Sequence, residues 1–313
     1  MSDTRRARVR ALAKINLDLR VLNKRPDGYH ELRTIFQTIS LADALEIAYT
    51  PSRRTCIELN DPLQIADNLV AKAARLVMDA LRATGRVEMQ LTKRIPMGAG
   101  LGGGSSDAAA VLLALPVLMR REISLPKLCD IARELGSDVP FFLLGGTAAG
   151  IGRGTELFPL ADGPARHGVL AAPGVHVNTA EAYRALSPRL TTESQQNKIF
   201  SFQSHTLGWG QEEAFENDFE AVVFAQHRSL ALWKKRLVRV GAKPALMTGS
   251  GSALFGLFES ARDASRARDQ LGDTEKTYPI SLVSRARYRS MWWKALEAEI
   301  EPKTWPPRSC NLR

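Results

Sequence analysis

The sequence has no apolar run long enough to cross a membrane, which takes about 20 residues. Its first residues, Met1 to Arg6, are polar with no apolar stretch behind them, so no secretory signal is expected. Cysteines are few and scattered, at Cys56, Cys129 and Cys310, with no metal-binding spacing. This usage fits a reducing compartment, and we expect a cytoplasmic protein with no membrane partner.

Acidic residues are fewer than basic ones. The sequence has 33 Asp and Glu and 43 Lys and Arg, which gives a formal net charge of +10. Such an excess of positive charge can help a protein to bind nucleic acid or anionic ligands. The basic residues are spread along the chain, with short clusters only at Arg5-Arg6 and at Lys234-Lys235-Arg236. No basic stripe is interleaved with aromatic residues, so we expect a small phosphate-rich substrate and no nucleic-acid partner.

The chain has 313 residues, 44% hydrophobic and 24% charged, which is typical of a globular protein with room for two domains. The composition changes near residues 160–167, and we therefore expect domains at residues 1–162 and 163–288. A basic tail with tryptophans follows at residues 289–313 and suggests a packing or pairing segment. The polar, weakly patterned stretch from Thr191 to Gly210 predicts a mobile insertion.

The early part of the chain reads as an antiparallel sheet. Apolar and polar residues alternate from Ile15 to Leu22, which predicts a half-buried strand. Because successive side chains of a strand point to opposite faces, Lys14, Asn16 and Asp18 are expected on one side.

Helical spacing of apolar residues predicts helices further along. Asp67-Asn68 can cap the first of them, and Pro116 is expected to kink or end the second. The expected helices cover residues 69–81, 105–115, 125–135, 179–186 and 262–271, and the later expected strands cover residues 87–91, 167–172, 254–258 and 280–283.

A glycine-rich loop lies between the strand at 87–91 and the helix that starts near Ser105. Five glycines stand within seven residues, from Gly98 to Gly104. Glycine adopts positive φ and allows close approach of the backbone, and the helix that follows presents free N–H groups to an anion. This pattern predicts a phosphate-binding loop. A flexible linker and a dinucleotide fingerprint are weaker interpretations, and no Gly-Lys-Ser/Thr follows to make a Walker loop.

Phosphoryl transfer needs a phosphate site, positive charge and a carboxylate that takes the proton of the acceptor hydroxyl. Asp138, after the helix that ends at Gly136, is the candidate general base, and Lys14 is the candidate cation beside it. From spacing alone, Asp138 can equally be a cap or turn residue and Lys14 a solvated lysine. Asp107 can be the third residue of its helix rather than a metal ligand.

Five motifs occur in order along the chain: Ala13-Lys14-Ile15-Asn16-Leu17, Arg25-Pro26-Asp27-Gly28-Tyr29-His30, Pro96 to Asp107, Leu135-Gly136-Ser137-Asp138-Val139-Pro140 and Thr248-Gly249-Ser250-Gly251. Together they resemble the galacto-, homoserine, mevalonate and phosphomevalonate (GHMP) kinase superfamily, over roughly residues 11–287. Within it, the triple glycine and the Tyr29-His30 segment are similar to the branch that phosphorylates a cytidine diphosphate conjugate of methylerythritol.

The resemblance implies an α+β fold with two domains: an N-terminal domain like domain 2 of ribosomal protein S5 and a ferredoxin-like C-terminal domain. It implies ATP and Mg²⁺ as cofactors, with Asp138 and Lys14 as the catalytic residues. ATP is expected near Asn68 and Lys93 and at the loop residues Pro96, Met97, Gly98, Ala99, Gly100, Leu101, Gly102, Gly103, Gly104, Ser105 and Ser106. Ser106 is the expected metal ligand, with Ser105 nearly as plausible.

The resemblance also implies the acceptor site. Tyr29 and Tyr183 match residues that stack on cytosine, and His30 matches one that hydrogen-bonds it. Asn16 and Thr179 fall at substrate-side positions. The expected reaction is ATP-dependent phosphorylation of the 2-hydroxyl of the methylerythritol moiety in the non-mevalonate isoprenoid pathway. The alternatives are another kinase of the superfamily, such as homoserine or mevalonate kinase, and an RNA-binding protein on an S5-like fold. The sequence does not indicate an oligomeric state.

Overall fold

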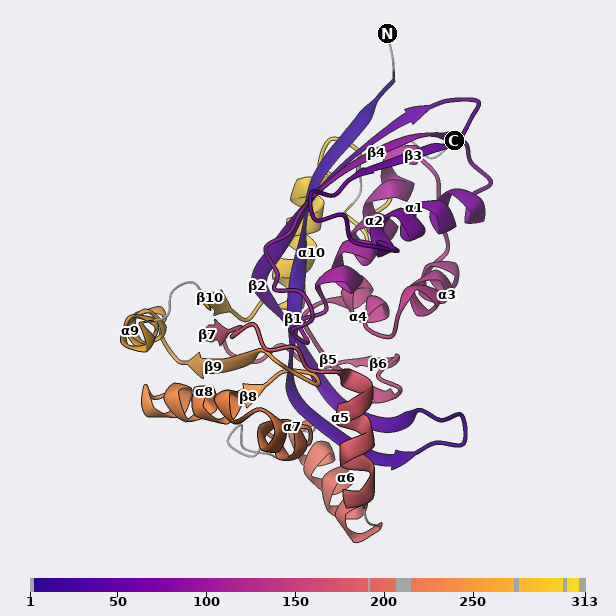
Figure 1. The fold of residues 1–313 in the computed structure, drawn as a ribbon. Helices are drawn as coiled ribbons and strands as arrows, with labels where there is room; N and C mark the ends of the chain where they lie inside the picture. The colour runs from indigo at the N-terminus through magenta and orange to yellow at the C-terminus, as the bar shows by residue number, and fades with distance from the viewer. Residues whose placement is uncertain (1–2, 191, 207–214, 273–275, 301–302, 310–313) are drawn as a thin grey trace.

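The computed structural model describes residues 3–190, 192–206, 215–272, 276–300 and 303–309. It contains two β-sheets, each covered by helices, as expected for an α+β protein with two domains. A long hairpin of β1 (Arg5–Lys24) and β2 (His30–Pro51) runs through the whole molecule. Figure 1 shows α1 to α4 on one side of this hairpin and the second sheet on the other.

The first sheet has six strands in the order β3-β4-β2-β5-β6, with β1 paired to β2. Strand β2 is continuous over its whole length, and it pairs with β4 near its end and with β5 near its start. The one parallel pair among the named strands of the described chain, β3 with β4, is connected through α1. The remaining strands of the sheet are β3 (Cys56–Asn60), β4 (Gly85–Thr92), β5 (Thr147–Gly152) and β6 (Glu156–Pro159).

Helix α2 (Gly103–Met119) lies at the centre of the first domain and is buried from Ser106 onward. It is longer than predicted, because Pro116 does not end it but lies within its last turn. The helix ends at Met119, and Arg120, which follows, has a positive φ. Around it pack α1 (Leu69–Ala80), α3 (Leu125–Leu135) and α4 (Val139–Leu144), and the predicted bounds of α1 and α3 are correct to within one residue.

The second sheet has the strand order β10-β7-β9-β8, and all its pairs are antiparallel. Its chain order is strand, helices, two strands, helix and strand, which is the ferredoxin-like arrangement that was expected. One face packs on the hairpin, through apolar residues such as Ile15 and Phe255. The strands are β7 (His167–Ala171), β8 (Ala245–Met247), β9 (Leu254–Phe258) and β10 (Thr277–Ser281).

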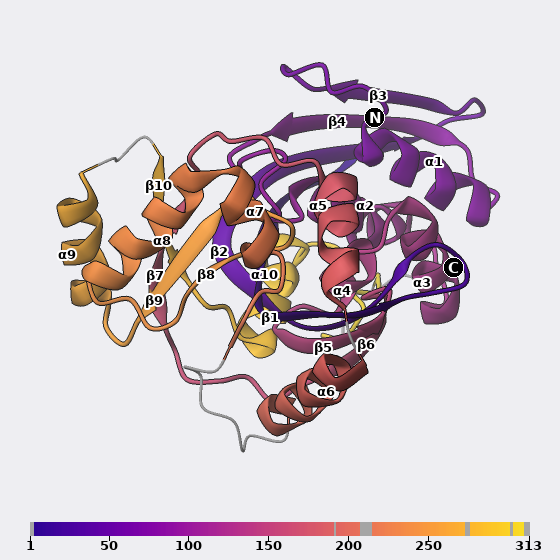
Figure 2. The ribbon, with the colours of Figure 1, turned by 60° about the horizontal axis from the view of Figure 1, so that its bottom comes forward.

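Helices α5 (Thr179–Leu186), α7 (Glu220–Gln226), α8 (Arg228–Arg239) and α9 (Ala261–Leu271) belong to the second domain. Figure 2 shows α8 and α9 on the far side of the hairpin from α1 and α3. The predicted insertion at residues 191–210 is wrong for its central part, which forms α6 (Thr192–Thr206). Residues 191 and 207–210 lie outside the described chain.

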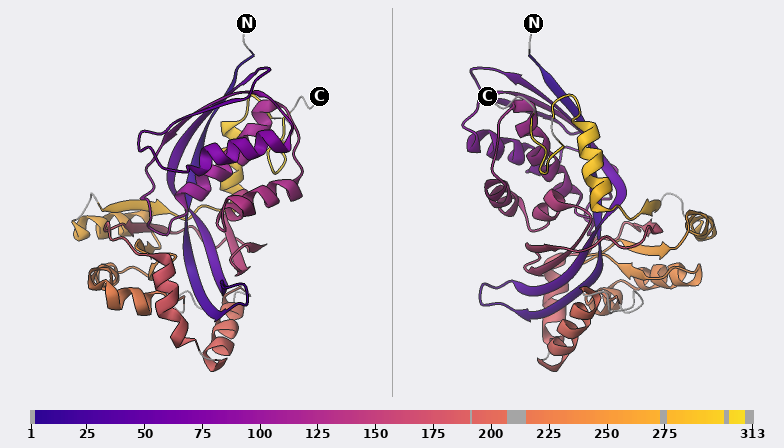
Figure 3. Two further views of the ribbon diagram at one scale, coloured as in Figure 1. Left: turned by 45° about the vertical axis from the view of Figure 1, so that its right-hand side comes forward. Right: turned by 180° about the vertical axis from the view of Figure 1, so that it is seen from behind.

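Helix α10 (Arg285–Ala295) runs beside β1 in both views of Figure 3. The expected boundary at residue 288 therefore falls inside a helix. Tyr288 and Trp292 are buried in the core of the first domain, and the Tyr288 hydroxyl donates to the carbonyl of Phe142 at 2.6 Å. This part of the tail packs against the first domain. No helix in the described chain is long and apolar enough to cross a membrane.

Candidate active site

The glycine loop sits between β1 and the turn at residues 248–251. The backbone N–H of Lys14 donates to the carbonyl of Leu101 at 3.0 Å, and the N–H of Ala253 donates to that of Ala99 at 3.2 Å. Gly100 has φ +77°, and a Cβ there would lie 2.4 Å from the carbonyl oxygen of Thr248. Only glycine fits this position, so the loop stays close to both neighbours.

The loop leads directly into the N-terminus of α2. Its cap residue is Gly102, at φ 68°, with no side chain to satisfy the first N–H groups of the helix. A Cβ at Gly102 would approach the Phe142 ring to 2.9 Å. Free N–H groups beside bare backbone form the arrangement that binds phosphate, so the residues present fit a nucleoside triphosphate.

Lys14 lies in β1 between two irregularities of the β1–β2 pairing, at Leu12/Lys14 and at Asn16/Asp18. Bulges re-aim side chains and are frequent beside active sites. The second one breaks the predicted alternation: Lys14 and Asn16 line the cleft, whereas the Asp18 carboxylate pairs with Arg20 at 3.0 Å. Lys14 is 3% exposed, which excludes the interpretation as a solvated lysine.

Asp138 stands at the start of α4, where its side chain makes no capping hydrogen bond. Its carboxylate Oδ2 lies 3.5 Å from Nζ of Lys14, and the side chain is 32% exposed. The structure therefore does not support the capping alternative. It presents one carboxylate that is held beside a buried ammonium and open to the cleft.

A hydrogen-bond network fixes Asn16 beside Lys14. The Lys14 ammonium donates to Asn16 Oδ1 at 2.8 Å, and Asn16 Nδ2 donates to the Thr34 hydroxyl at 2.7 Å. The backbone N–H of Asn16 donates to the hydroxyl of Thr248 at 3.0 Å, which ties β1 to the second domain. Asn16 and Thr34 are almost fully buried.

These groups share one cleft of about 560 Å³ between the two domains. The size is typical of small-molecule sites. The cleft brings together segments that are far apart in sequence: β1, the glycine loop, the start of α4, the start of α5 and the turn at residues 248–251. The lining residues that the sequence singled out are Lys14, Asn16, Gly98, Gly100, Asp138, Thr179, Tyr183, Gly249, Ser250 and Gly251.

The predicted acceptor residues lie toward the hairpin end and α5. The His30 and Tyr183 rings stack with centroids 4.7 Å apart, and the edge of Tyr183 meets Phe219. His30 Nε2 lies 2.8 Å from the Ser187 hydroxyl. Tyr29 is 52% exposed, and the Arg153 guanidinium lies 3.5 Å from the centroid of its ring. Each of the two tyrosine rings thus has a side chain of the protein beside it, His30 at Tyr183 and Arg153 at Tyr29.

Electrostatics distinguish two of these aromatic groups. Burial, and then the charge of Lys24, lower the pKa of His30 below its usual 6.5, so the ring is neutral at neutral pH. Burial, and then the charge of Asp138, raise the pKa of Tyr183 to about 12, so its hydroxyl keeps its proton. At the start of the same helix, the Thr179 and Ser250 hydroxyls lie 2.8 Å apart.

Lys93 and Asn68 are both engaged within the protein. Nζ of Lys93 donates to buried carboxylates of Asp43 and Asp107, the latter at 2.7 Å. Burial, and then the charge of Asp43, raise the pKa of Asp107 to about 7. Asn68 caps α1, as predicted, because its Oδ1 accepts from the N–H of Val70 at 3.0 Å. Asp107 is therefore a buried partner of Lys93.

The two candidate metal-binding serines have different environments. Ser106 is 2% exposed, and its hydroxyl donates to the carbonyl of Leu12 at 2.7 Å. Ser105, one residue earlier in α2, is half-buried. In the described chain no three His, Cys, Asp or Glu side chains are grouped as a metal site. Mg²⁺ commonly takes only one or two protein ligands plus substrate phosphates, so these residues remain compatible with it.

Sequence reasoning missed Thr34 and Arg153, which also line the cleft. Thr34 lies in a strand in which apolar and polar residues are mixed, and nothing in that pattern indicates that Thr34 belongs to a functional site. Arg153 lies within a cluster of glycines that runs from Gly145 to Gly154, and that cluster is the signal the sequence offers for it.

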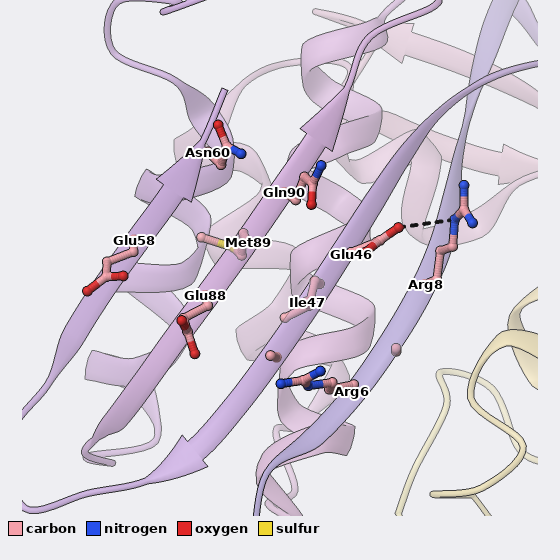
Figure 4. Close-up of a pocket in the computed structure, with 11 residues that line it drawn as sticks. Arg6, Arg8, Glu46, Ile47, Glu58, Asn60, Glu88, Met89 and Gln90 are labelled. Carbon is pink, nitrogen blue, oxygen red and sulfur yellow. Dashed lines mark ion pairs between the residues drawn. The ribbon is translucent and has the colours of Figure 1, made fainter. Parts of the chain in front are cut away.

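A second hollow of about 510 Å³ lies on the open face of the first sheet. Figure 4 shows its charged side chains standing on β1, β2, β3 and β4, with Arg8 paired to Glu46 at 3.4 Å. None of the predicted site residues lines it. The cleft between the domains is therefore the candidate active site.

Comparison with known proteins shows the family to which the chain belongs. The model of the GHMP kinases N terminal domain matches residues 68–146, and that of the GHMP kinases C terminal matches residues 201–276. The chain is 67% identical over 313 residues to a 4-diphosphocytidyl-2-C-methyl-D-erythritol kinase of Solibacter usitatus, covering 99% of both chains.

Solved structures show the same similarity. A crystal structure of 4-(cytidine 5'-diphospho)-2C-methyl-D-erythritol kinase is 38% identical, with a TM-score of 0.74 over 88% of this chain and 98% of that one. A homoserine kinase from Cytophaga hutchinsonii, at 18% identity, has a TM-score of 0.66 over 89% of this chain and 95% of that one, and shows the shared fold alone. The chain therefore belongs to the 4-diphosphocytidyl-2-C-methyl-D-erythritol kinase family, within the ATP-dependent GHMP kinases.

Proposed function

We propose that this kinase transfers the γ-phosphoryl group of ATP to the 2-hydroxyl of 4-diphosphocytidyl-2-C-methyl-D-erythritol, with Asp138 as general base and Lys14 assisting. The family supports this acceptor. The observation that carries the residue roles is the Lys14–Asp138 pair, 3.5 Å apart, in the cleft that Gly98 and Gly100 also line.

The glycine loop and the N-terminus of α2 are proposed to hold the phosphates of ATP. ATP supplies the γ-phosphoryl group, and ADP is the leaving group. The chain supplies positioned N–H donors, which stabilise negative charge that spreads over the phosphate oxygens. Asn68 and Lys93 are proposed to lie near the adenine. Because the Lys93 ammonium is already paired with Asp43 and Asp107, its contribution there comes from the backbone.

The acceptor hydroxyl is proposed to lie between Asp138 and the phosphate site. As its oxygen bonds to the γ-phosphorus, the bond from that phosphorus to the oxygen that bridges the β- and γ-phosphates breaks. ADP leaves with that oxygen. The hydroxyl proton passes to the Asp138 carboxylate. The Lys14 ammonium keeps that carboxylate ionised and oriented before the transfer.

Mg²⁺ is proposed to reach the site on the phosphates of ATP and to neutralise part of their charge. Ser106 can offer a lone pair of its hydroxyl oxygen, because its proton is given to the carbonyl of Leu12. Ser105 is the more accessible of the two serines. Either hydroxyl can supply one ligand.

The cytosine of the acceptor is proposed to bind among Tyr29, His30 and Tyr183. A neutral His30 ring has one donor and one acceptor nitrogen. This suits cytosine, whose edge carries both hydrogen-bond donors and acceptors. The base can stack on an aromatic face once His30 and Tyr183 separate. Asn16 and Thr179 are proposed to contact the acceptor nearer the reacting hydroxyl.

The test is ATP consumption with a panel of acceptor alcohols that contains the cytidine diphosphate conjugate, homoserine and mevalonate. We expect turnover of the conjugate alone. Turnover of homoserine or mevalonate instead would overturn the acceptor assignment. Activity on none of the three would count against a kinase of this branch. An RNA-binding role is not supported, since the family consists of kinases.

The role of Asp138 is tested by Asp138→Asn. We expect turnover to fall by a factor of about 10² or more, in the range that general-base catalysis contributes, while ATP still binds by calorimetry. Asp130→Asn is the control, because that carboxylate is exposed on α3, where it pairs with Arg133, and does not line the cleft. Near-normal turnover of Asp138→Asn would remove Asp138 as the base.

A further inference from the structure

Thr34 is a buried residue of β2 whose hydroxyl faces the network around Lys14. It is 1% exposed and comes from the strand opposite the one that carries Lys14 and Asn16. Its hydroxyl oxygen lies 2.7 Å from the carbonyl oxygen of Asp18 and 2.7 Å from Nδ2 of Asn16. The two contacts have different requirements for the hydroxyl proton.

The carbonyl of Asp18 can only accept a hydrogen bond, so the single hydroxyl proton of Thr34 is committed to it. The Thr34 oxygen then has only lone pairs to offer Asn16. The side-chain amide of Asn16 must therefore turn its NH₂ group toward Thr34 and its oxygen the other way.

The oxygen that is turned away is the one that meets the catalytic cation. Asn16 Oδ1 accepts from Nζ of Lys14 at 2.8 Å and from the Thr248 hydroxyl at 3.2 Å. A flipped amide would present an NH₂ group to an ammonium, which has three donors and no acceptor. Lys14 would then lose its nearest acceptor and its orientation toward Asp138, 3.5 Å away.

The carbonyl of Asp18 is in place because of the bulge in β1. In the β1–β2 register, Asn16 is opposite Phe36 and Asp18 is opposite Ile35, which is the adjacent residue of β2. Leu17 is therefore an extra residue in β1, with no partner in this register. Without the extra residue, the carbonyl that receives the Thr34 proton would be displaced along the strand. The bulge and Thr34 thus act together on the same amide.

We propose that Thr34 is a positioning residue of the phosphoryl-transfer site: through its committed proton it fixes the amide of Asn16, and through Asn16 it holds Lys14 toward Asp138. Thr34 touches neither reacting group. The inference rests on the proposed roles of Lys14 and Asp138, and it adds a residue that neither the motifs nor the family assignment singled out.

The test is Thr34→Val, which keeps the shape of the side chain and removes the lone pairs. We expect kcat to fall about tenfold or more, from the cost of one unpaired buried polar group. KM for ATP should stay within about twofold, because the glycine loop is untouched. Thr34→Ser keeps the hydroxyl and should restore kcat to near the wild-type value.

A matched control is Thr38→Val on the same strand. Thr38 is fully buried, and its hydroxyl accepts from the N–H of Gly146 at 3.0 Å, away from Asn16. This variant should lose similar thermal stability and keep kcat. A loss of kcat equal to that of Thr34→Val would show a general effect of a buried hydroxyl and overturn the proposal.

A double-mutant cycle with Asn16→Ala isolates the route of the effect. If Thr34 acts through Asn16, Thr34→Val has no further effect on kcat in the Asn16→Ala background. A full, independent loss there would overturn the proposal, as would an unchanged kcat in Thr34→Val or no rescue by serine. If Thr34→Val does not fold, Thr34→Ala removes the same lone pairs and takes its place in every comparison.

The wild-type enzyme separates this inference from the proposed function. All ratios are measured with whichever acceptor the wild type phosphorylates. If that acceptor is not the cytidine diphosphate conjugate, the proposed function fails, while the effect of Thr34 on kcat is still measured.

Discussion

Replacement of Gly100 by alanine tests whether close contact between two glycine loops holds the phosphate site. Gly100 has φ +77°, and a Cβ there would lie 2.4 Å from the carbonyl oxygen of Thr248 and 3.1 Å from that of Gly251. Both atoms belong to the backbone and cannot rotate away as a side chain would. The variant must therefore move the loop at residues 98–102 away from the turn at residues 248–251.

The cost has two parts. A left-handed conformation costs a residue with a Cβ about 1–2 kcal/mol, and forcing extra atoms into filled space costs about 1–3 kcal/mol. We expect the free energy of unfolding of Gly100→Ala to fall by about 2–5 kcal/mol, the sum of these two ranges. Because displacement of the loop also moves the phosphate donors, kcat/KM for ATP should fall by about tenfold or more, which corresponds to about 1.4 kcal/mol or more.

Gly241→Ala is the matched control. Gly241 has φ +92°, but a Cβ there would have no atom within 4 Å. This variant has the conformational cost alone, about 1–2 kcal/mol, and lies outside the cleft, so its kcat/KM should not change. Chemical denaturation and steady-state kinetics measure both variants. Equal losses of stability and equal kinetics in the two would refute the argument from loop contact.

Two further changes test other parts of the site. The pKa of Asp107 is raised to about 7 from 3.8, so the folded protein holds this proton more tightly than the unfolded chain, and stability falls as pH rises toward 7. Asp107→Asn removes this titration, so its melting temperature should drop less than that of the wild type, or rise, between about pH 4 and about pH 7; equal changes would show that Asp107 does not titrate there. Tyr29→Ala should raise KM for the cytidylated acceptor far more than KM for ATP, because it removes a stacking surface; an equal rise in both would contradict a cytosine site at Tyr29.

Local patterns in the sequence were sufficient wherever neighbouring residues decide the structure. Asp67-Asn68 before an apolar helical pattern predicted the cap and the start of α1, and the helical spacing of apolar residues predicted α3. The glycines between a strand and a helix predicted the loop that now leads into α2. These signals depend on backbone freedom, capping and periodicity, all of which act within a few residues.

Other expectations failed where packing overrides local preference. Pro116 did not end α2, because that helix is buried along most of its length and ends only at Met119. The polar stretch after Thr191 predicted no regular structure, yet residues 192–206 form α6, in which Lys198 pairs with Asp218 at 2.6 Å. Contacts with distant parts of the chain supply what the local sequence lacks.

The sequence by itself determined which residue types are available for phosphoryl transfer, since the five motifs carry the glycines, the lysine and the aspartate in order. Only the tertiary structure decided that Lys14 is buried beside Asp138 rather than solvated, because β1 and α4 are 124 positions apart at these residues and meet only in the folded protein. The orientation of Asn16 likewise depends on a bulge and on Thr34 in the neighbouring strand. Proton direction in a hydrogen-bond network follows from which groups face one another, and no periodicity of the sequence encodes that.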